Sequence, residues 1–255
     1  MKSIAMIAAA MCMAASTTLL NAQRGAGGQG RGAPASAREG AAIDLTGYWV
    51  SVISEDWKFR MVTPKKGVYD SLPLNAEGRR VADTWDPAKD EAAGEQCRSY
   101  GAASIMRVPG RLHITWQDDN TLRIETDAGT QTRVLRFGAS GASAVSNDSP
   151  SWQGQSNAQW EYSGGPRRGP RTGSLKIVTT NLRPGYVRKN GAPYSAKAVV
   201  TEYLDLNAMP NGDSWFTVTT KVEDPVYFAR PYLTTTDFKK LPDAAGWKPQ
   251  PCSSR

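Results

Sequence analysis

The sequence has little of the material from which common enzyme sites are built. Among its 255 residues there is one histidine, His113, and there are three cysteines. A single imidazole excludes metal sites with two histidine ligands and proton relays that need two imidazoles. The Gly-x-Ser-x-Gly elbow and the phosphate loop are missing, and no dinucleotide fingerprint follows an expected strand. We therefore expect neither a cofactor nor a metal site.

Runs of positive charge are also missing. The formal net charge is +7, but after Ala42 no run of Lys and Arg is longer than two residues. A charge of this size and scatter contributes to solubility and does not predict binding to nucleic acid. We expect no nucleic-acid partner.

Long apolar runs are missing too, apart from one stretch at the start. Residues 4–20 are almost entirely apolar, they follow Lys2, and Ala22 offers a small residue for cleavage. This is the pattern of a secretory signal peptide, and it is too short and too Ala-rich for a membrane span. We expect cleavage near Ala22, no transmembrane segment, and a mature protein that is periplasmic or secreted.

The rest of the chain divides by composition into a tether and one domain. Residues 23–42 are rich in Gly, Ala and Arg without a large apolar side chain, which predicts a disordered tether. Residues 43–255 are expected to form a single domain. Strand-like alternation occurs over 43–53, 111–117, 121–127, 130–137, 152–162, 175–182, 197–206 and 215–222.

Only one convincing helix interrupts these strands. It is expected over 76–85, with Asn75 as its N-cap and Asp86-Pro87 ending it. Many strands without an alternating helix rhythm predict an all-β fold, namely an antiparallel lipocalin-like barrel with one short helix. A β-sandwich is the alternative. Closure into a barrel would remove the exposed edges of the sheet.

The polar face of the hairpin over 111–127 holds the only histidine beside carboxylates. His113, Arg123, Glu125 and Asp127 share this face by period-2 alternation. If the face lines the interior, the set could act as a catalytic acid–base group, with Arg133 as a further neighbour. If the face is outside, cross-strand pairing alone explains these residues. Alternation does not say which face is inside.

Tryptophan is the remaining signal, with eight residues in the chain. Those in or beside strands are either core residues or the lining of a cavity for an apolar or aromatic ligand. The candidates for ligand binding are Trp49, Trp57, Trp116, Trp152 and Trp215.

The cysteines predict one disulfide bond. Cys12 lies in the apolar leader, which leaves Cys97 and Cys252 as an even pair in an exported chain. A disulfide that closes so long a loop should stabilise the folded state by on the order of 4–5 kcal/mol, because it lowers the conformational entropy of the unfolded chain.

Two resemblances add to this interpretation. Gly47-Tyr48-Trp49 resembles the Gly-x-Trp signature of lipocalin-like β-barrels. A longer set of segments resembles a widespread family of exported bacterial proteins whose activity is not established. The matching positions are Cys97, Gly101, 105–106, 109–111, 150–154, 190–195, 222–225 and 251–252. The resemblance implies a secreted β-barrel-like domain and brings no catalytic residues with it.

Three functions are compatible with the sequence. The first is an exported barrel that binds a small apolar or aromatic molecule. The second is a cofactor-independent isomerase, cyclase, lyase or hydrolase that uses acid–base residues in the barrel. The third is an envelope-associated structural protein. An apolar interior would favour the first, converging polar groups the second and a filled interior the third. The sequence does not indicate an oligomeric state.

Overall fold

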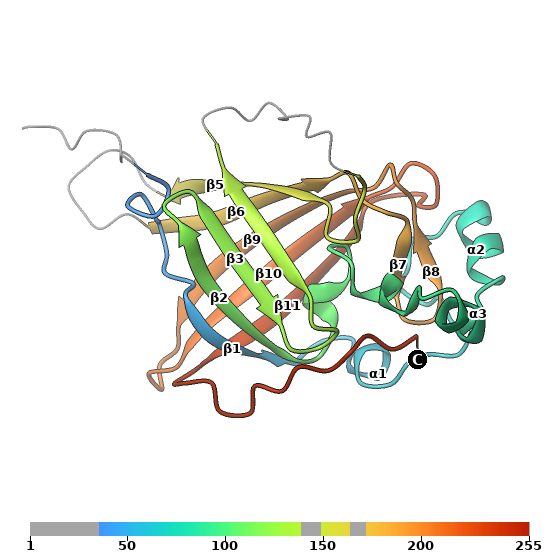
Figure 1. Ribbon diagram of the computed structural model, residues 1–255, viewed down its shortest axis with the longest axis horizontal. Coiled ribbons are helices and arrows are strands. Elements are labelled where there is room, and N and C mark those ends of the chain that lie inside the picture. The colour runs from blue at the N-terminus through green and yellow to red at the C-terminus, as the bar shows by residue number, and fades with distance from the viewer. Residues whose placement is uncertain (1–35, 139–148, 164–171, 255) are drawn as a thin grey trace, which may run out of the picture. The chain divides into compact units, whose positions relative to one another are not determined.

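A computed structural model describes residues 36–138, 149–163 and 172–254, and among them nine strands form a closed barrel (Figure 1). The barrel strands are β1 (Gly47–Val52), β2 (Arg111–Asp118), β3 (Thr121–Thr126), β4 (Thr132–Phe137), β5 (Gln155–Ser163), β6 (Thr172–Thr180), β9 (Val199–Ala208), β10 (Ser214–Glu223) and β11 (Tyr232–Leu241). Their order around the barrel is β1-β11-β10-β9-β6-β5-β4-β3-β2. The all-β barrel predicted from the sequence is confirmed.

The odd number of strands determines one detail of the topology. Strand directions cannot alternate all the way around a ring of nine, so at least one neighbouring pair must be parallel. That pair is β4 and β5, and every other neighbouring pair is antiparallel. The end of β4 and the start of β5 therefore point to opposite ends of the barrel.

The interior of the barrel is filled by side chains. Trp49 is fully buried, and its ring meets Phe216 edge to face at 4.6 Å between centroids. Phe216 in turn stacks on Phe238 at 4.9 Å. Nearer the other end of the interior, Arg133 bonds Glu202 at 2.6 Å between Nη2 and Oε2, with both side chains 0% exposed. The interior therefore has an aromatic part and a buried ion pair.

One end of the barrel is closed by aromatic rings and by residues 36–42. Trp160 donates from Nε1 to the carbonyl of Ala37 at 2.8 Å, and the backbone N–H of Arg38 donates to Asp119 at 3.0 Å. The prediction of a tether over 23–42 was therefore wrong at its last residues, because these bonds attach them to the barrel. The expected signal peptide, 1–22, and the expected tether over 23–35 lie outside the described residues.

The opposite end carries short helices and a small hairpin, which we call the end lobe (residues 53–110 and 181–198; Figure 1). Its elements are α1 (Trp57–Arg60), α2 (Ala76–Ala82), α3 (Pro87–Ala92), the 3₁₀ helices η1 (Gln96–Tyr100) and η2 (Ile105–Arg107), and the strands β7 (Gly185–Arg188) and β8 (Ala192–Tyr194). Within the described residues no helix is long and apolar enough to cross a membrane.

Only α2 was expected from the sequence. Asn75 caps it as predicted, since its side chain accepts from the N–H of Gly78 at 2.8 Å. The expected end of the helix was wrong, because α2 ends at Ala82. Asp86 and Pro87 instead begin the next helix: Asp86 caps α3, and Pro87 occupies its first turn. The prediction of a single helix was therefore wrong, because the structure has several short helices. Helices of four to seven residues carry little periodic signal, because they depend on tertiary packing.

Strand β11 was also missed. Its inward positions include Thr236, which is 1% exposed, while its buried apolar residues are Tyr232 and Phe238. A strand with threonine on its buried face shows weak hydrophobic alternation. Its place is determined by pairing on both sides, with β1 and with β10.

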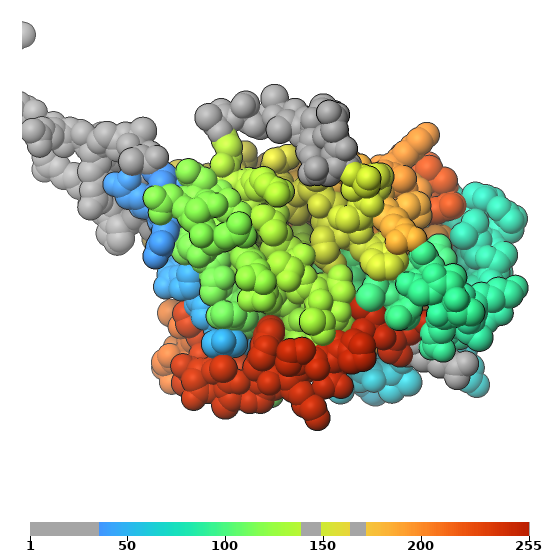
Figure 2. Space-filling model, viewed as in Figure 1, coloured from blue at the N-terminus to red at the C-terminus, as the bar shows by residue number. Residues whose placement is uncertain are grey.

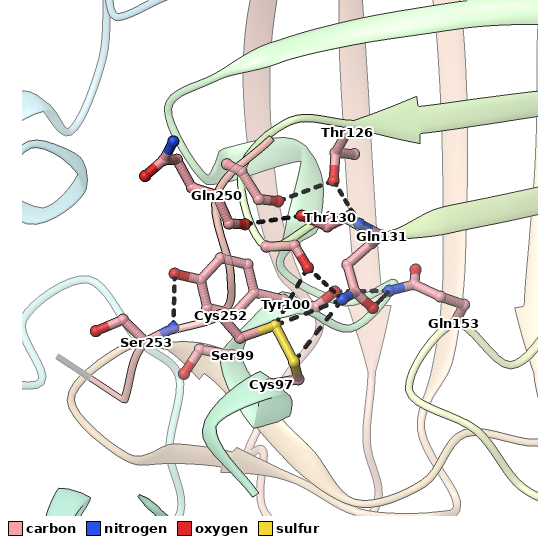
Figure 3. The surroundings of a disulfide bond; sticks show 12 residues. Cys97, Ser99, Tyr100, Thr126, Thr130, Gln131, Gln153, Gln250, Cys252 and Ser253 are labelled. Atoms are coloured by element: carbon pink, nitrogen blue, oxygen red, sulfur yellow. Dashed lines mark hydrogen bonds between the residues drawn. A yellow bond between two sulfur atoms is a disulfide. The ribbon is translucent and has the colours of Figure 1, made fainter. Parts of the chain in front are cut away.

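The C-terminal segment returns along the outside of the barrel after β11. Figure 2 shows this segment, in red, on the surface below the strands drawn in green. This segment contains Cys252, which forms the predicted disulfide with Cys97 of η1, at 5.0 Å between Cα atoms (Figure 3). The side chain of Gln131 contacts both sulfur atoms through Nε2, at 3.8 Å and 3.4 Å. The disulfide prediction is confirmed.

Removing the disulfide should destabilise the fold. The change Cys97→Ser with Cys252→Ser should lower the free energy of unfolding by about 2–5 kcal/mol, because the unfolded chain regains the entropy of the open loop. Urea unfolding under oxidising conditions measures this. In reducing buffer the wild type and the double variant should be equally stable, and equal stability in oxidising buffer would contradict the prediction.

The buried ion pair gives a second stability test. Glu202→Gln leaves the charge of Arg133 buried without its partner and should cost about 3–5 kcal/mol of unfolding free energy. The double change Arg133→Met with Glu202→Met removes both charges and should cost clearly less. Denaturant unfolding of the wild type and of these two variants measures both costs. A Glu202→Gln cost below about 1 kcal/mol would show that the pair is unimportant.

Candidate functional site

The hairpin places its polar face on the outside of the barrel. Leu112 and Ile114 are buried in the core, so the neighbouring His113 points outward. His113 Nδ1 lies 3.3 Å from Glu125 Oε2, and Arg123 Nη2 donates to Glu125 Oε1 at 2.8 Å. These three residues come together as the alternation predicted. They do so on the outer face, where cross-strand pairing explains them.

The outer face around His113 is covered by aromatic rings. His113 stacks on Tyr48 with 4.1 Å between ring centroids, and Trp247 from the C-terminal segment lies edge-on at 6.1 Å. The other two predicted members lie elsewhere. Asp127 accepts from the backbone N–H of Arg111 at 2.7 Å, and Arg133 bonds Glu202 inside the barrel. The structure therefore does not join all the predicted acid–base residues in one concave site.

The predicted ligand-binding tryptophans do not converge either. Trp49 is a core residue whose Nε1 donates to the carbonyl of Leu45 at 2.8 Å. Trp116 packs near Phe137 at the closed end of the barrel, at 5.5 Å between centroids. They occupy the interior and so behave as packing residues.

The other three tryptophans predicted to bind a ligand lie outside the barrel interior. Trp57 is 66% exposed on α1, and Trp152 lies under the guanidinium of Arg183 at 4.6 Å. Trp215 precedes the inward-facing Phe216 and so faces outward. A cavity with several aromatic residues in its lining lies in the end lobe, and none of these three tryptophans is among them.

That cavity is a cleft of about 230 Å³ between α2, α3, η1 and the β7–β8 hairpin; we call it the aromatic cleft. Four of its lining residues are aromatic, and an acid–base pair lies beside them. The residues used below are Trp85, Asp90, Arg98, Tyr186, Tyr194 and Tyr227. They come from four separate parts of the sequence.

The backbone of the lobe positions the aromatic walls. Gly191 has a φ of +82° in the β7–β8 turn, and a Cβ there would lie 2.2 Å from the Cβ of Trp85. Only glycine allows both this conformation and this close approach. On the other side, the N–H of Asn75 at the start of α2 donates to the carbonyl of Tyr227 at 2.9 Å. Trp85 and Tyr227 are thereby held against the hairpin and α2.

A buried carboxylate organises the polar side of the aromatic cleft. Asp90 is 7% exposed and accepts from Arg98 Nη1 at 3.0 Å and from the Tyr186 hydroxyl at 3.0 Å. The guanidinium of Arg98 also lies 4.6 Å from the centre of the Tyr186 ring. A buried charge needs such partners to offset its lost hydration. The result is a fixed carboxylate, guanidinium and phenol.

Both buried tyrosines of the cleft remain protonated at neutral pH. Burial raises the pKa of Tyr186 and Tyr194 above the ordinary value of tyrosine, and the nearby charge of Arg98 partly opposes the rise. The hydroxyl of Tyr194, Nε1 of Trp85 and Nε of Arg98 are buried and have no hydrogen-bond partner. Unsatisfied buried polar atoms are rare in folded proteins and require an explanation. Here three of them belong to residues that line one cleft.

The sequence analysis did not identify the lining residues of the aromatic cleft, because no local sequence pattern connects them. One segment on which the resemblance rests, 190–195, does contribute Tyr194 to the aromatic cleft, and Arg98 follows directly after Cys97. That is the signal that could have found it. Within the described residues, no group of three or more His, Cys, Asp and Glu side chains is placed to hold a metal ion. Comparisons with family models, curated proteins and solved structures found no match to this chain.

Tyrosine burial predicts a loss of stability at high pH. Burial, with a bond to Asp83, also raises the pKa of Tyr69 to about 12. An unfolded tyrosine titrates near pH 10, so the native state is favoured below about pH 10 and loses this advantage as the pH rises further. Urea unfolding between about pH 9 and pH 12 should show a falling midpoint, and the fall should be smaller in Tyr194→Phe. A midpoint that stays constant would contradict this.

Proposed function

We propose that the protein is a binding protein for a small, neutral, aromatic molecule that carries an oxygen acceptor. The site is the aromatic cleft at the end of the barrel. The observation that carries this proposal is the cleft itself: four aromatic side chains surround about 230 Å³ beside polar atoms without partners. Small-molecule sites are typically apolar and aromatic with a few polar groups that orient the ligand.

The size of the aromatic cleft indicates the size of the ligand. An apolar cavity of about 150 Å³ accepts benzene, and sites for drug-sized ligands begin near 300 Å³. A cleft of about 230 Å³ is therefore suited to one substituted ring.

The charges around the aromatic cleft favour a neutral ligand. Asp90 is paired with Arg98, and Asp86 lies 3.9 Å from Lys89. Each lining carboxylate thus has a cation beside it. Polar recognition then depends on groups such as the indole N–H of Trp85 and the hydroxyl of Tyr194, which small side-chain movements would bring to a ligand oxygen.

The barrel interior supports this choice of site indirectly. A lipocalin-type site would need space where Trp49, Phe216 and Phe238 pack. A ligand in that place would have to displace well-packed aromatic rings, at a cost of several kcal/mol. The barrel is better suited to serve as a rigid scaffold for the end lobe.

Two features support export of the protein. The leader-like segment 1–22 has the pattern of a signal peptide, and the bond between Cys97 and Cys252 is typical of an oxidising compartment. We therefore propose a periplasmic or secreted binding protein.

Phenol is the probe that tests the aromatic cleft. Isothermal titration should show one phenol bound per chain, with toluene bound more weakly because it lacks the oxygen. Trp85→Phe and Tyr194→Phe each remove one polar group and keep a ring. Each should weaken phenol binding by roughly fivefold, the effect of about 1 kcal/mol for a hydrogen bond.

The matched control is Trp57→Phe, which changes an exposed tryptophan outside the cleft and should leave phenol binding unchanged. The proposal is wrong if phenol does not bind to the wild type. It is also wrong if both cleft variants bind phenol as tightly as the Trp57→Phe control.

A further inference from the structure

A second cavity of the end lobe has a different chemistry. It encloses about 50 Å³ between α1, the two 3₁₀ helices and β7, and we call it the arginine cavity. Four cationic side chains and two serines are among its lining residues: Arg60, Arg107, Arg188, Lys189, Ser99 and Ser104. Such a concentration of positive charge around so small a space requires counter-charge.

Two of the arginines have carboxylate partners. Arg60 donates from Nη1 to Glu55 Oε1 at 2.6 Å, and its side chain is only 2% exposed. Arg107 donates from Nη2 to Asp56 Oδ2 at 2.8 Å. Even so, Nη2 of Arg60 is buried without a hydrogen-bond partner. Glu55 and Asp56 thus neutralise two cations and leave one buried donor free.

The surroundings of Arg188 differ from those of Arg60 and Arg107. Arg188 is 7% exposed, and within the described residues no carboxylate lies within ion-pairing distance of its guanidinium. Its Nη2 donates to the carbonyl of Asp70 and to the Ser71 hydroxyl, both at 3.1 Å, and the phenol of Tyr232 is a further polar neighbour. Its Nη1 is buried and unpartnered. A buried guanidinium bonded only to neutral groups is costly without a counter-ion.

The arginines also act on one another. Burial lowers the pKa of Arg60 and of Arg188, and repulsion from Arg107 lowers both further. Lys189 adds a fourth cation, with Nζ 3.0 Å from the hydroxyl of Tyr100. Three arginines line the cavity, and the two carboxylates Glu55 and Asp56 bond Arg60 and Arg107, so the potential inside favours a negative ligand.

We infer that the arginine cavity binds a small oxyanion, a carboxylate or a phosphate, as the counter-ion of Arg188. Guanidinium groups bind these anions through paired N–H donors, and Arg60 and Arg188 each have a donor without a partner. A water molecule takes up about 30 Å³, so a cavity of about 50 Å³ is suited to a small free oxyanion or to the charged group of a larger ligand.

The anion could be a free ion or the headgroup of a lipid. The segment that lines the cavity with Phe59 and Arg60 also exposes apolar side chains: Trp57 is 66% exposed, Met61 60% and Val62 66%. Exposed apolar residues beside a basic site are common to surfaces that contact membranes. Both sources share the same oxyanion chemistry, and the experiment separates them.

The first arm measures free anions. Isothermal titration with inorganic phosphate and with acetate, at constant ionic strength in sodium chloride, should show binding of at least one of them to the wild type. Arg188→Gln should weaken that binding at least about tenfold, the effect expected for a charged hydrogen bond. Arg80→Gln changes an arginine that is 67% exposed and paired with Glu77 on α2, and it should leave anion binding unchanged.

Two further measurements test anion binding in the arginine cavity even if Arg188→Gln folds poorly. Lys189→Met removes a cation from the edge of the cavity and should weaken the same binding. The bound anion should also raise the melting temperature of the wild type and of Arg80→Gln, but not of Arg188→Gln.

The second arm uses vesicles of phosphatidylcholine with and without phosphatidic acid. Sedimentation with the acidic vesicles that is lost in Arg188→Gln assigns the oxyanion to a lipid headgroup, and Trp57→Ala should then weaken it as well. Phosphate or acetate binding without sedimentation assigns it to a free ion. The inference is overturned if neither anion binds up to about 10 mM and no vesicles bind, or if Arg188→Gln binds as the wild type does. Phenol binding in the aromatic cleft is independent of either result.

Discussion

The bond between Cys97 and Cys252 is the constraint on which the end lobe depends. It joins the C-terminal segment, which has crossed the outside of the barrel, to the helix η1. The next two residues of η1 are Arg98, which lines the aromatic cleft, and Ser99, which lines the arginine cavity. One covalent link therefore holds a wall of each cavity in place. The bonds of Gln131 to the two sulfurs and to the carbonyl of Gly129 extend this attachment to the β3–β4 turn (Figure 3).

The two cavities differ in how their charges are compensated. In the aromatic cleft, Asp90 bonds both Arg98 and Tyr186, and the local charge is balanced. In the arginine cavity, Arg188 is buried with neutral acceptors only. A balanced cleft with aromatic walls favours a neutral ring, whereas an excess of buried positive charge favours an anion. The two proposed sites of the lobe therefore differ in the charge of the ligand that they favour.

The barrel supports the lobe because it is closed and filled. Among the described residues, closure leaves the barrel sheet without a free edge, and a ring of nine strands requires at least one parallel pair, which is β4 and β5. Packed side chains and the pair Arg133–Glu202 occupy the interior. The long connections that leave the barrel at one end, 53–110 and 181–198, form the lobe where the cavities lie. Binding sites commonly occur on such connections, because the strands hold the ends of each connection rigidly.

The sequence by itself determined the local features of this protein: strands from their alternation, the cap of Asn75 on α2, and the pairing of Cys97 with Cys252. It could not decide which face of the 111–127 hairpin is inside, because period-2 alternation is the same for both; the core packing of Leu112 and Ile114 decided it and left His113 outside. Nor could it find the aromatic cleft. Trp85, Arg98 and Tyr186 become neighbours only when the lobe folds, since long-range pairing and packing are not encoded in any local pattern.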